Sequence, residues 1–186
     1  MRIVGGKLSG RSLAVPKTQN IRPTTDRTRE SLFNILEHSP AVQLQDARVL
    51  DIFAGTGALG LEALSRGAQF ALFIEKSHEG RGLLRANIEA LGMTGCTKVF
   101  KRDATNAGPL GGIAPFHLVF ADPPYAKQLG QKAIANLAQQ GWLVPGAVVV
   151  LEEAVSHLPE QVEGFEKLDQ RRYGDSAIGI FQLGQK

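Results

Sequence analysis

Residues 48–60, Arg-Val-Leu-Asp-Ile-Phe-Ala-Gly-Thr-Gly-Ala-Leu-Gly, decide the fold class of this chain of 186 residues. The segment opens with a short apolar run typical of a buried strand and ends with glycines at positions 55, 57 and 60. A glycine-rich turn between a strand and a helix lets the backbone approach a ligand closely, at the carboxyl edge of a sheet. The segment therefore predicts a strand, a ligand-binding turn and a helix.

Downstream of this segment, strand-like apolar runs alternate with helical stretches, as in βαβ units around a mainly parallel sheet. The last two runs are joined by Gly174-Asp175, a hairpin signal, so we expect an antiparallel pair to end the α/β sheet. The predicted strands are 48–54, 70–76, 97–102, 117–121, 147–152, 166–173 and 177–183, and the predicted helices are 57–66, 79–91 and 127–140.

Residues 1–45 precede this pattern and are predicted to form an extension to a ligand-binding domain over residues 46–186. Residues 1–15 contain short alternating stretches joined through glycines, which indicates a small β-hairpin. Thr25 is expected to cap a helix that runs to about His38 and that Pro40 ends.

Positive charge is concentrated in the first part of the chain. Residues 1–29 carry seven cations and one anion, whereas the remainder carries fourteen cations and seventeen anions. A basic arm on a slightly acidic body is typical of a protein that binds a polyanion such as RNA, although a solvated terminal segment would show the same charge. The predicted RNA-binding residues are Arg2, Lys7, Arg11, Arg22, Arg27 and Arg29.

Composition excludes several classes of protein. No apolar stretch is long enough to span a bilayer, and the first residues lack the apolar core of a secretory signal. Cys96 is the single cysteine, so an internal disulfide framework is excluded, and the four histidines are scattered without metal-ligand spacing. We expect a cytoplasmic monomer with no membrane partner and no metal.

The glycine turn allows two ligands. Gly55-x-Gly57-x-x-Gly60 is also the dinucleotide fingerprint, with Glu75 about 20 residues further on as the ribose acceptor. Asp51 favours the other ligand, because an anion just before the turn would oppose a pyrophosphate but suits a ligand with sulfonium and ammonium groups. The prediction is therefore S-adenosyl-L-methionine.

The predicted cofactor site follows successive strands. Glu75 would accept hydrogen bonds from both ribose hydroxyls, and Asp103 would accept one from the adenine amino group, with the Ala104 N–H near the ring. Either carboxylate alone would be read as a surface group at a strand end. The full set is Asp51, Phe53, Ala54, Gly55, Thr56, Gly57, Glu75, Lys76, Asp103 and Ala104.

The predicted catalytic residues are Asp122, Pro123, Pro124 and Tyr125, which follow the fourth parallel strand. The two prolines stiffen the backbone and remove two N–H donors, which leaves a rigid set of hydrogen-bond acceptors. The Asp122 carboxylate and the Pro123 carbonyl can each accept an N–H from a base amino group and orient its nitrogen toward a methyl donor. Tyr125 would stack on the base.

These four residues resemble the amino-methyltransferases with an (Asp/Asn)-Pro-Pro-(Phe/Tyr/Trp) motif, which act on DNA adenine, DNA cytosine or RNA guanine. Residues 22–34, Arg-Pro-Thr-Thr-Asp-Arg-Thr-Arg-Glu-Ser-Leu-Phe-Asn, resemble the bacterial 16S ribosomal RNA guanine-N2 methyltransferase family, as do residues 57–67 and 172–181. This resemblance spans essentially the whole chain. It implies a Rossmann-like class I methyltransferase with a seven-stranded sheet of order 3-2-1-4-5-7-6.

The same resemblance implies methylation of one guanine in 16S ribosomal RNA, within the small ribosomal subunit or its assembly intermediate. Two rival functions stay open. A DNA adenine or cytosine amino-methyltransferase shares these motifs but normally adds a recognition domain, for which the chain has little room. A nicotinamide-dependent oxidoreductase, or a nucleotide-binding module without catalysis, would account for the glycines but not for the acceptor loop.

Overall fold

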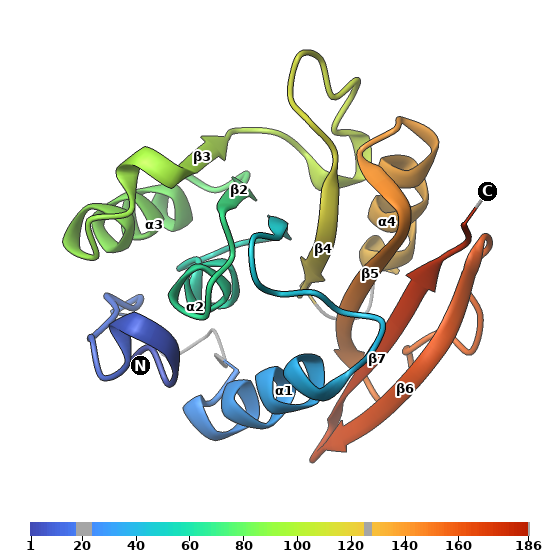
Figure 1. Cartoon of the computed structure of the whole chain (residues 1–186), viewed down its shortest axis with the longest axis horizontal. Coiled ribbons are helices and arrows are strands. Elements are labelled where there is room, and N and C mark those ends of the chain that lie inside the picture. The colour runs from blue at the N-terminus through green and yellow to red at the C-terminus, as the bar shows by residue number, and fades with distance from the viewer. Residues whose placement is uncertain (18–23, 125–127, 186) are drawn as a thin grey trace.

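A seven-stranded sheet of order β3-β2-β1-β4-β5-β7-β6 forms the centre of the computed structural model (Figure 1). The structure describes residues 1–17, 24–124 and 128–185. Strands β1 to β5 pair in parallel, and β7 pairs antiparallel with both β5 and β6. The strand order and the closing hairpin agree with the sequence-based prediction. The strands are β1 (Arg48–Ile52), β2 (Phe70–Ile74), β3 (Thr97–Phe100), β4 (Phe116–Ala121), β5 (Leu143–Ala154), β6 (Phe165–Tyr173) and β7 (Ser176–Leu183).

The helices are α1 (Asp26–His38), α2 (Ala58–Ser65), α3 (His78–Ala90) and α4 (Leu129–Gln139), with short 3-10 turns η1 (Gly6–Leu8), η2 (Thr94–Cys96) and η3 (Ala104–Asn106). Thr25 caps α1 as predicted, because its side chain accepts a hydrogen bond from the Thr28 N–H at 3.1 Å. Within the described residues, no helix is both long and apolar enough to cross a membrane.

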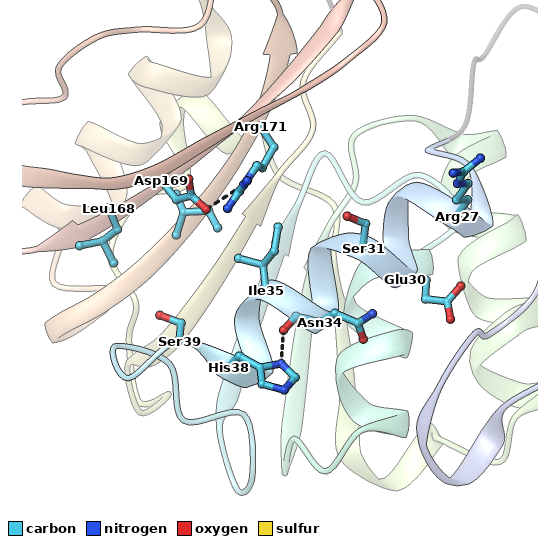
Figure 2. A pocket seen from close by; sticks show the side chains of 11 residues that line it. Arg27, Glu30, Ser31, Asn34, Ile35, His38, Ser39, Leu168, Asp169 and Arg171 are labelled. Carbon is cyan, nitrogen blue, oxygen red and sulfur yellow. Dashed lines mark hydrogen bonds and ion pairs between the residues drawn. The ribbon is translucent and has the colours of Figure 1, made fainter.

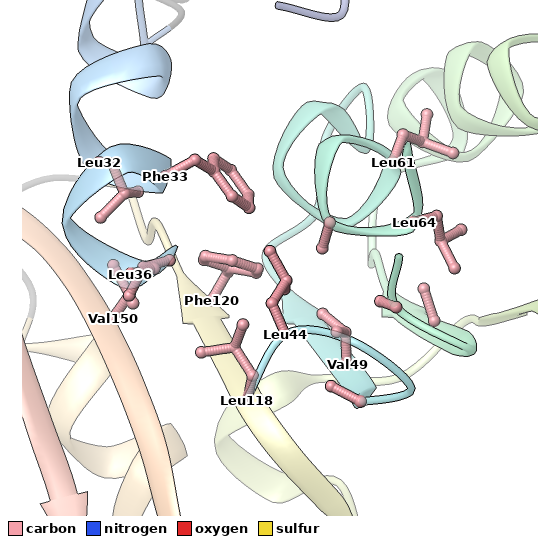
Figure 3. Close-up of a cluster of buried hydrophobic side chains, with 14 of the residues drawn as sticks. Leu32, Phe33, Leu36, Leu44, Val49, Leu61, Leu64, Leu118, Phe120 and Val150 are labelled. Atoms are coloured by element: carbon pink, nitrogen blue, oxygen red, sulfur yellow. The ribbon is translucent and has the colours of Figure 1, made fainter. Parts of the chain in front are cut away.

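Two apolar cores hold the sheet between its helices. Figure 3 shows the first core, in which Phe33 and Leu36 of α1 lie beside Phe120 of β4 and Val150 of β5. The rings of Phe33 and Phe120 are 5.5 Å apart between centroids. On the other face, α4 packs on alternate residues of the same strands. Full burial of each such side chain contributes roughly 1.5–3 kcal/mol to the stability of the fold. Apolar packing therefore stabilises both faces of the sheet.

Strand β5 is longer than its predicted range of 147–152. It begins at Leu143, which pairs with Phe116, and the register then shifts so that Leu118 pairs with Val148. Gly146 in this irregular part has a φ of 77°. The proline and glycine before residue 147 conceal this pairing, because such residues normally mark the end of a strand.

The predicted N-terminal β-hairpin is present in a short form without regular strands: the Ile3 N–H donates to the Arg11 carbonyl at 2.9 Å, and the Leu13 N–H donates to the Met1 carbonyl at 3.0 Å. Within residues 1–17 the structure has one isolated bridge, Arg2 with Ser12, and the 3-10 turn η1. The Glu62 carboxylate of α2 accepts the N–H groups of Val4 at 2.9 Å and Gly5 at 2.8 Å. These two hydrogen bonds hold the hairpin against α2.

The N-terminal extension is joined to the rest of the protein by buried contacts. Asn87 of α3 accepts the Ala14 N–H at 2.7 Å and donates to the Ala14 and Thr56 carbonyls at 3.1 and 3.0 Å. Ile3 and Leu13 are buried in the same core as Val49 of β1 and Leu61 of α2. A continuous core therefore crosses residue 45, and the division into residues 1–45 and 46–186 stays a prediction.

Candidate active site

The glycine loop joins β1 to α2 at the carboxyl edge of the sheet, as the sequence predicts. The chain turns at Phe53, whose φ of 59° is unusual for a bulky residue, and the Ala54 N–H donates to the Ile74 carbonyl at 3.1 Å. Gly57 has a φ of 79°, and a Cβ there would overlap the side chain of Leu84. The loop therefore needs glycine at position 57 both for its conformation and for its packing.

Asp51 is buried beneath this loop and is 3% exposed. Its Oδ2 accepts the Gly60 N–H at 3.0 Å, so the carboxyl joins β1 to the first turn of α2. Burial, together with a smaller effect of the nearby Glu75 carboxylate, raises the pKa of Asp51 to about 8, although the Gly60 hydrogen bond acts in the opposite direction. Asp51 therefore holds the loop in place. Because its pKa is raised, the carboxyl carries a negative charge at neutral pH mainly when a cationic ligand lies next to it and stabilises the ionised form.

We expect Asp51→Asn to make the free energy of unfolding less dependent on pH. Between the ordinary value of 3.8 and the raised pKa of about 8, the folded protein keeps a proton that the unfolded chain has lost, so stability falls as pH rises. The asparagine oxygen can still accept the Gly60 N–H. In urea unfolding from pH 5 to 8, the free energy of unfolding of the variant should increase relative to that of wild type by up to about 1.4 kcal/mol per pH unit.

The matched control for Asp51→Asn is Glu79→Gln, at an exposed carboxylate on α3. Its free energy of unfolding should run parallel to that of wild type over the same pH range. A difference between Asp51→Asn and wild type that stays constant with pH would contradict the assigned pKa.

Glu75 lies half-buried just after β2 and joins two segments of the site. Its carboxylate accepts the Gly55 N–H at 2.7 Å and the Ser77 N–H at 2.8 Å. The glycine loop and the end of β2 are therefore held together by one side chain. The structure brings Glu75 next to Gly55, as the predicted cofactor site requires.

Asp103 follows β3 at the next position along the same edge. Its carboxylate accepts hydrogen bonds from the Thr105 N–H and hydroxyl at 3.0 and 2.6 Å, and it forms an exposed ion pair with Lys76 at 3.1 Å. The Thr105 hydrogen bonds, helped by Lys76, lower the pKa of Asp103 to about 2, so this carboxylate is ionised at neutral pH. Ala104 is buried beside it.

Asp122 is half-buried immediately after β4. Burial raises the pKa of Asp122 well above its ordinary value, and the carboxylates of Glu152, Asp51 and Glu153 raise it further. Pro123 is buried and Pro124 is exposed, whereas Tyr125 lies outside the described residues. The structure thus brings Asp122 close to Asp51, on the side where the glycine loop begins.

Sequence reasoning missed Glu152, which is 8% exposed near the end of β5. Its Oε2 accepts the Thr24 hydroxyl at 2.9 Å. The sequence does carry a signal for it, because Glu152 ends an apolar run just as Glu75 does. In the described part of the chain, no group of three or more His, Cys, Asp or Glu side chains could hold a metal ion.

One predicted RNA-binding residue is corrected by the structure. Arg29 is fully buried, and its guanidinium forms an ion pair with Asp26 at 2.8 Å and donates to the carbonyls of Thr24 and Arg2. Arg29 therefore fastens the extension to α1 and is not free to contact a phosphate. Arg22 lies outside the described residues, and the four exposed cations of the set are Arg2, Lys7, Arg11 and Arg27.

A cavity of about 810 Å³ lies away from the predicted cofactor and catalytic residues, between α1 and β6. Figure 2 shows Arg27, Asn34 and His38 of α1 on one side and Asp169 and Arg171 of β6 on the other. Asp169 and Arg171 form an ion pair at 3.0 Å. The cavity walls carry both signs of charge, so they do not define a site for an anion.

Comparison with known proteins identifies the family. A family profile described as Conserved hypothetical protein 95 matches residues 1–182. Ribosomal RNA small subunit methyltransferase D of Escherichia coli is 38% identical over 98% of this chain and 89% of its own length. A protein named as an rRNA methyltransferase in Bacillus subtilis is 32% identical over 98% of both chains.

Solved structures agree with this assignment. The methyltransferase yhhF from Escherichia coli has a TM-score of 0.84 and 35% identity, and the match covers 100% of this chain and 99% of that one. A methylase from Haemophilus influenzae has a TM-score of 0.79 and 29% identity, with 98% of each chain covered. The chain therefore belongs to the Conserved hypothetical protein 95 family, the family of the small-subunit ribosomal RNA methyltransferases.

Proposed function

We propose that the protein transfers a methyl group from S-adenosyl-L-methionine to the exocyclic N2 of a guanine in 16S ribosomal RNA. The observation that carries this proposal is the half-buried Asp122 carboxyl at the end of β4, on the same sheet edge as the glycine loop. The names of the relatives support ribosomal RNA as the substrate. We further propose that the enzyme acts as a cytoplasmic monomer on the small subunit or its assembly intermediate.

The residues at the sheet edge fit S-adenosyl-L-methionine. Glu75 is held in place by two backbone N–H donors, and each of its oxygens keeps a further lone pair for a ribose hydroxyl. Asp103 is ionised and 43% exposed, so it can accept a hydrogen bond from an adenine amino group. When bound, the cofactor supplies a methyl group on a positively charged sulfur. Phe53, Ala54, Thr56 and Gly57 complete the loop around it.

Asp122 would perform two tasks in catalysis. A base amino group is a poor nucleophile because its lone pair is delocalised into the ring, so it must be oriented by acceptors. The Asp122 carboxylate and the Pro123 carbonyl would each accept one N–H, and Tyr125 would stack on the base. The raised pKa of Asp122 makes it a stronger base than an ordinary aspartate, which suits it to take the proton that the methylated nitrogen releases.

The decisive experiment incubates the protein with labelled S-adenosyl-L-methionine and, separately, small ribosomal subunits, naked 16S ribosomal RNA, and DNA. Digestion of the product to nucleosides and mass spectrometry then identify the methylated base. The proposal expects N2-methylguanine from small subunits or their RNA. Methylated adenine or cytosine in DNA would contradict the proposal and would show that the protein is a DNA amino-methyltransferase.

The exposed cations of the extension are expected to supply much of the electrostatic affinity for RNA. Arg2 is 66% exposed at its side chain despite an ion pair with Asp26, and Lys7 and Arg11 are also exposed. Each phosphate contact on single-stranded RNA contributes about −0.7 to the slope of log affinity against log salt. Replacing all three residues by alanine should therefore flatten this slope by roughly 2, as measured by binding to small subunits across a salt series.

A matched control removes three exposed cations from the rest of the protein, Lys98, Lys101 and Lys132. It has the same net charge as the triple variant of the extension, so it reports any effect of total charge alone. Equal slopes for the two triple variants would show that the extension has no special role in RNA binding. S-adenosylhomocysteine affinity, measured for both, checks that each variant is folded.

A further inference from the structure

Two carboxyl groups stand side by side at the proposed methyl-acceptor site. In the parallel pairing of β4 with β5, Ala121 is opposite Leu151, so the next residues, Asp122 and Glu152, are also neighbours. Adjacent strands are about 4.8 Å apart, which is within the span of one base edge. Glu152 is 8% exposed, so its carboxyl is held in the protein rather than in bulk solvent.

Both side chains belong to the same face of the sheet. Phe120 and Val150 lie in the core beneath α1, and side chains two residues apart in a strand point to the same face. Continuing the alternation from these residues brings Asp122 and Glu152 to the α1 side. Glu152 also pairs with Ile178, a member of the same core. The influence of the Glu152 carboxylate on the pKa of Asp122 agrees with this proximity.

Thr24, which precedes the Thr25 cap of α1, contacts one of these two carboxyls, that of Glu152. The Thr24 hydroxyl donates to Glu152 Oε2 at 2.9 Å, and the Thr24 carbonyl accepts from the buried Arg29 guanidinium at 3.1 Å. Thr24 is therefore held from two directions, and it fixes one oxygen of Glu152. A side chain fixed in this way can present a defined acceptor to a substrate.

The chemistry of two adjacent acceptors selects among bases. On its pairing edge guanine presents N1–H beside its N2 amino group, so it offers donors on two neighbouring nitrogens. Adenine and cytosine present an amino group beside a bare ring nitrogen, which is an acceptor. A carboxylate opposite that ring nitrogen would place two acceptors face to face, and a buried polar group left unpaired is a strong basis for rejection.

We propose that Glu152 is a specificity-determining residue that accepts the N1–H of the target guanine while Asp122 accepts an N–H of the N2 amino group. This inference rests on the proposed function, since it assumes that guanine N2 is methylated. It adds the reason for the choice of base, which the Asp122-Pro-Pro-Tyr125 segment alone does not provide, because the resembling motif serves adenine and cytosine as well.

The test compares guanine with 2-aminopurine, which keeps the amino group that would be methylated but has no N1–H. The nucleotide methylated by wild type is first mapped in 16S ribosomal RNA by mass spectrometry. It is then replaced by 2-aminopurine in otherwise identical RNA or reconstituted small subunits, and single-turnover rates are measured. Wild type should methylate guanine at least about tenfold faster, the effect expected for loss of one good contact to a base.

Glu152→Gln should lower this rate ratio by about tenfold, because the glutamine amide can donate to the bare N1 of 2-aminopurine. The matched control is Thr24→Val, which removes the hydrogen bond to Glu152 but leaves its carboxylate. Thr24→Val should keep the wild-type ratio. A loss of selectivity in Thr24→Val equal to that in Glu152→Gln would overturn the proposal, because Glu152 would then act only by anchoring Thr24.

Two further outcomes separate this inference from the proposed function. If wild type forms N2-methylguanine but accepts 2-aminopurine at a similar rate, the role of Glu152 is wrong and the proposed function stands. This result needs no variant, so it holds even if Glu152→Gln fails to fold. If wild type forms no N2-methylguanine, the proposed function itself fails. A wild-type ratio that persists in a folded Glu152→Gln variant also overturns the inference.

Discussion

Asp122→Ala is expected to lower the single-turnover methylation rate by a factor of about 10²–10³, the usual effect of losing one preorganised polar contact to a transition state. The affinity for S-adenosylhomocysteine should change little, because the glycine loop of the predicted cofactor site is held by Glu75, which binds the Gly55 N–H, and not by Asp122. Calorimetry and rapid-quench measurements on the same preparation check both results. Near-normal turnover would remove Asp122 from the mechanism.

A conservative change at the same position separates geometry from charge. Asp122→Asn keeps an acceptor oxygen, and asparagine occurs at this position of the resembling motif, so it should retain more activity than Asp122→Ala. It cannot take up a proton in place of the carboxylate. Its rate should therefore fall between those of wild type and the alanine variant.

The pH dependence of the rate provides a second readout for Asp122. Because burial and the carboxylates of Glu152, Asp51 and Glu153 raise its pKa, Asp122 is still partly protonated at pH values where an ordinary aspartate is fully ionised. The protonated form has lost acceptor capacity, so the wild-type rate should rise with pH as the proton leaves. This rise should be weaker in Asp122→Asn, and an unchanged profile would assign the dependence to another group.

The second large effect is expected at Glu75. Glu75→Ala removes the carboxylate that bonds the Gly55 and Ser77 N–H groups and that would accept both ribose hydroxyls. Loss of two charge-assisted hydrogen bonds should cost about 1.5–3 kcal/mol of S-adenosylhomocysteine binding, which calorimetry measures directly. Binding equal to that of wild type would exclude Glu75 from the cofactor site.

Two controls make the Glu75 result specific. Glu75→Gln keeps an oxygen for the Gly55 N–H but loses the charge and the second acceptor, which binds the Ser77 N–H, so its affinity should lie between those of wild type and Glu75→Ala. Glu79→Ala removes an exposed carboxylate four residues further along, on α3, and should leave the affinity unchanged. Melting temperatures of all three variants show whether any loss reflects unfolding.

The parts of the fold that depend on local chemistry could be predicted from the sequence. The glycine loop after β1 and the Thr25 cap of α1 are short-range features, and both occur where predicted. Alternation of apolar strands and helices is likewise visible along the chain, because each element must bury its own apolar face. The order of the strands came from resemblance to a family rather than from these patterns.

Features that depend on distant partners could not be predicted in this way. The attachment of the N-terminal hairpin to α2 depends on Glu62, about 57 residues further on, whose carboxylate accepts the N–H groups of Val4 and Gly5. Arg29 looked like one more cation of a basic arm, yet it is buried against Asp26 and two carbonyls. Its neighbours in sequence do not reveal these contacts.

Some features of the candidate site can likewise be predicted from the sequence, whereas others depend on the folded structure. The sequence predicts that carboxylates follow successive strands beside a glycine loop, and parallel strands end at one edge of a sheet. The burial of Asp51, with its pKa of about 8, and the position of Glu152 next to Asp122 follow from the folded structure and not from the local sequence. Burial and strand pairing arise from contacts between residues that are distant in the chain. The pKa and the neighbours of each carboxyl are therefore set only when the sheet forms.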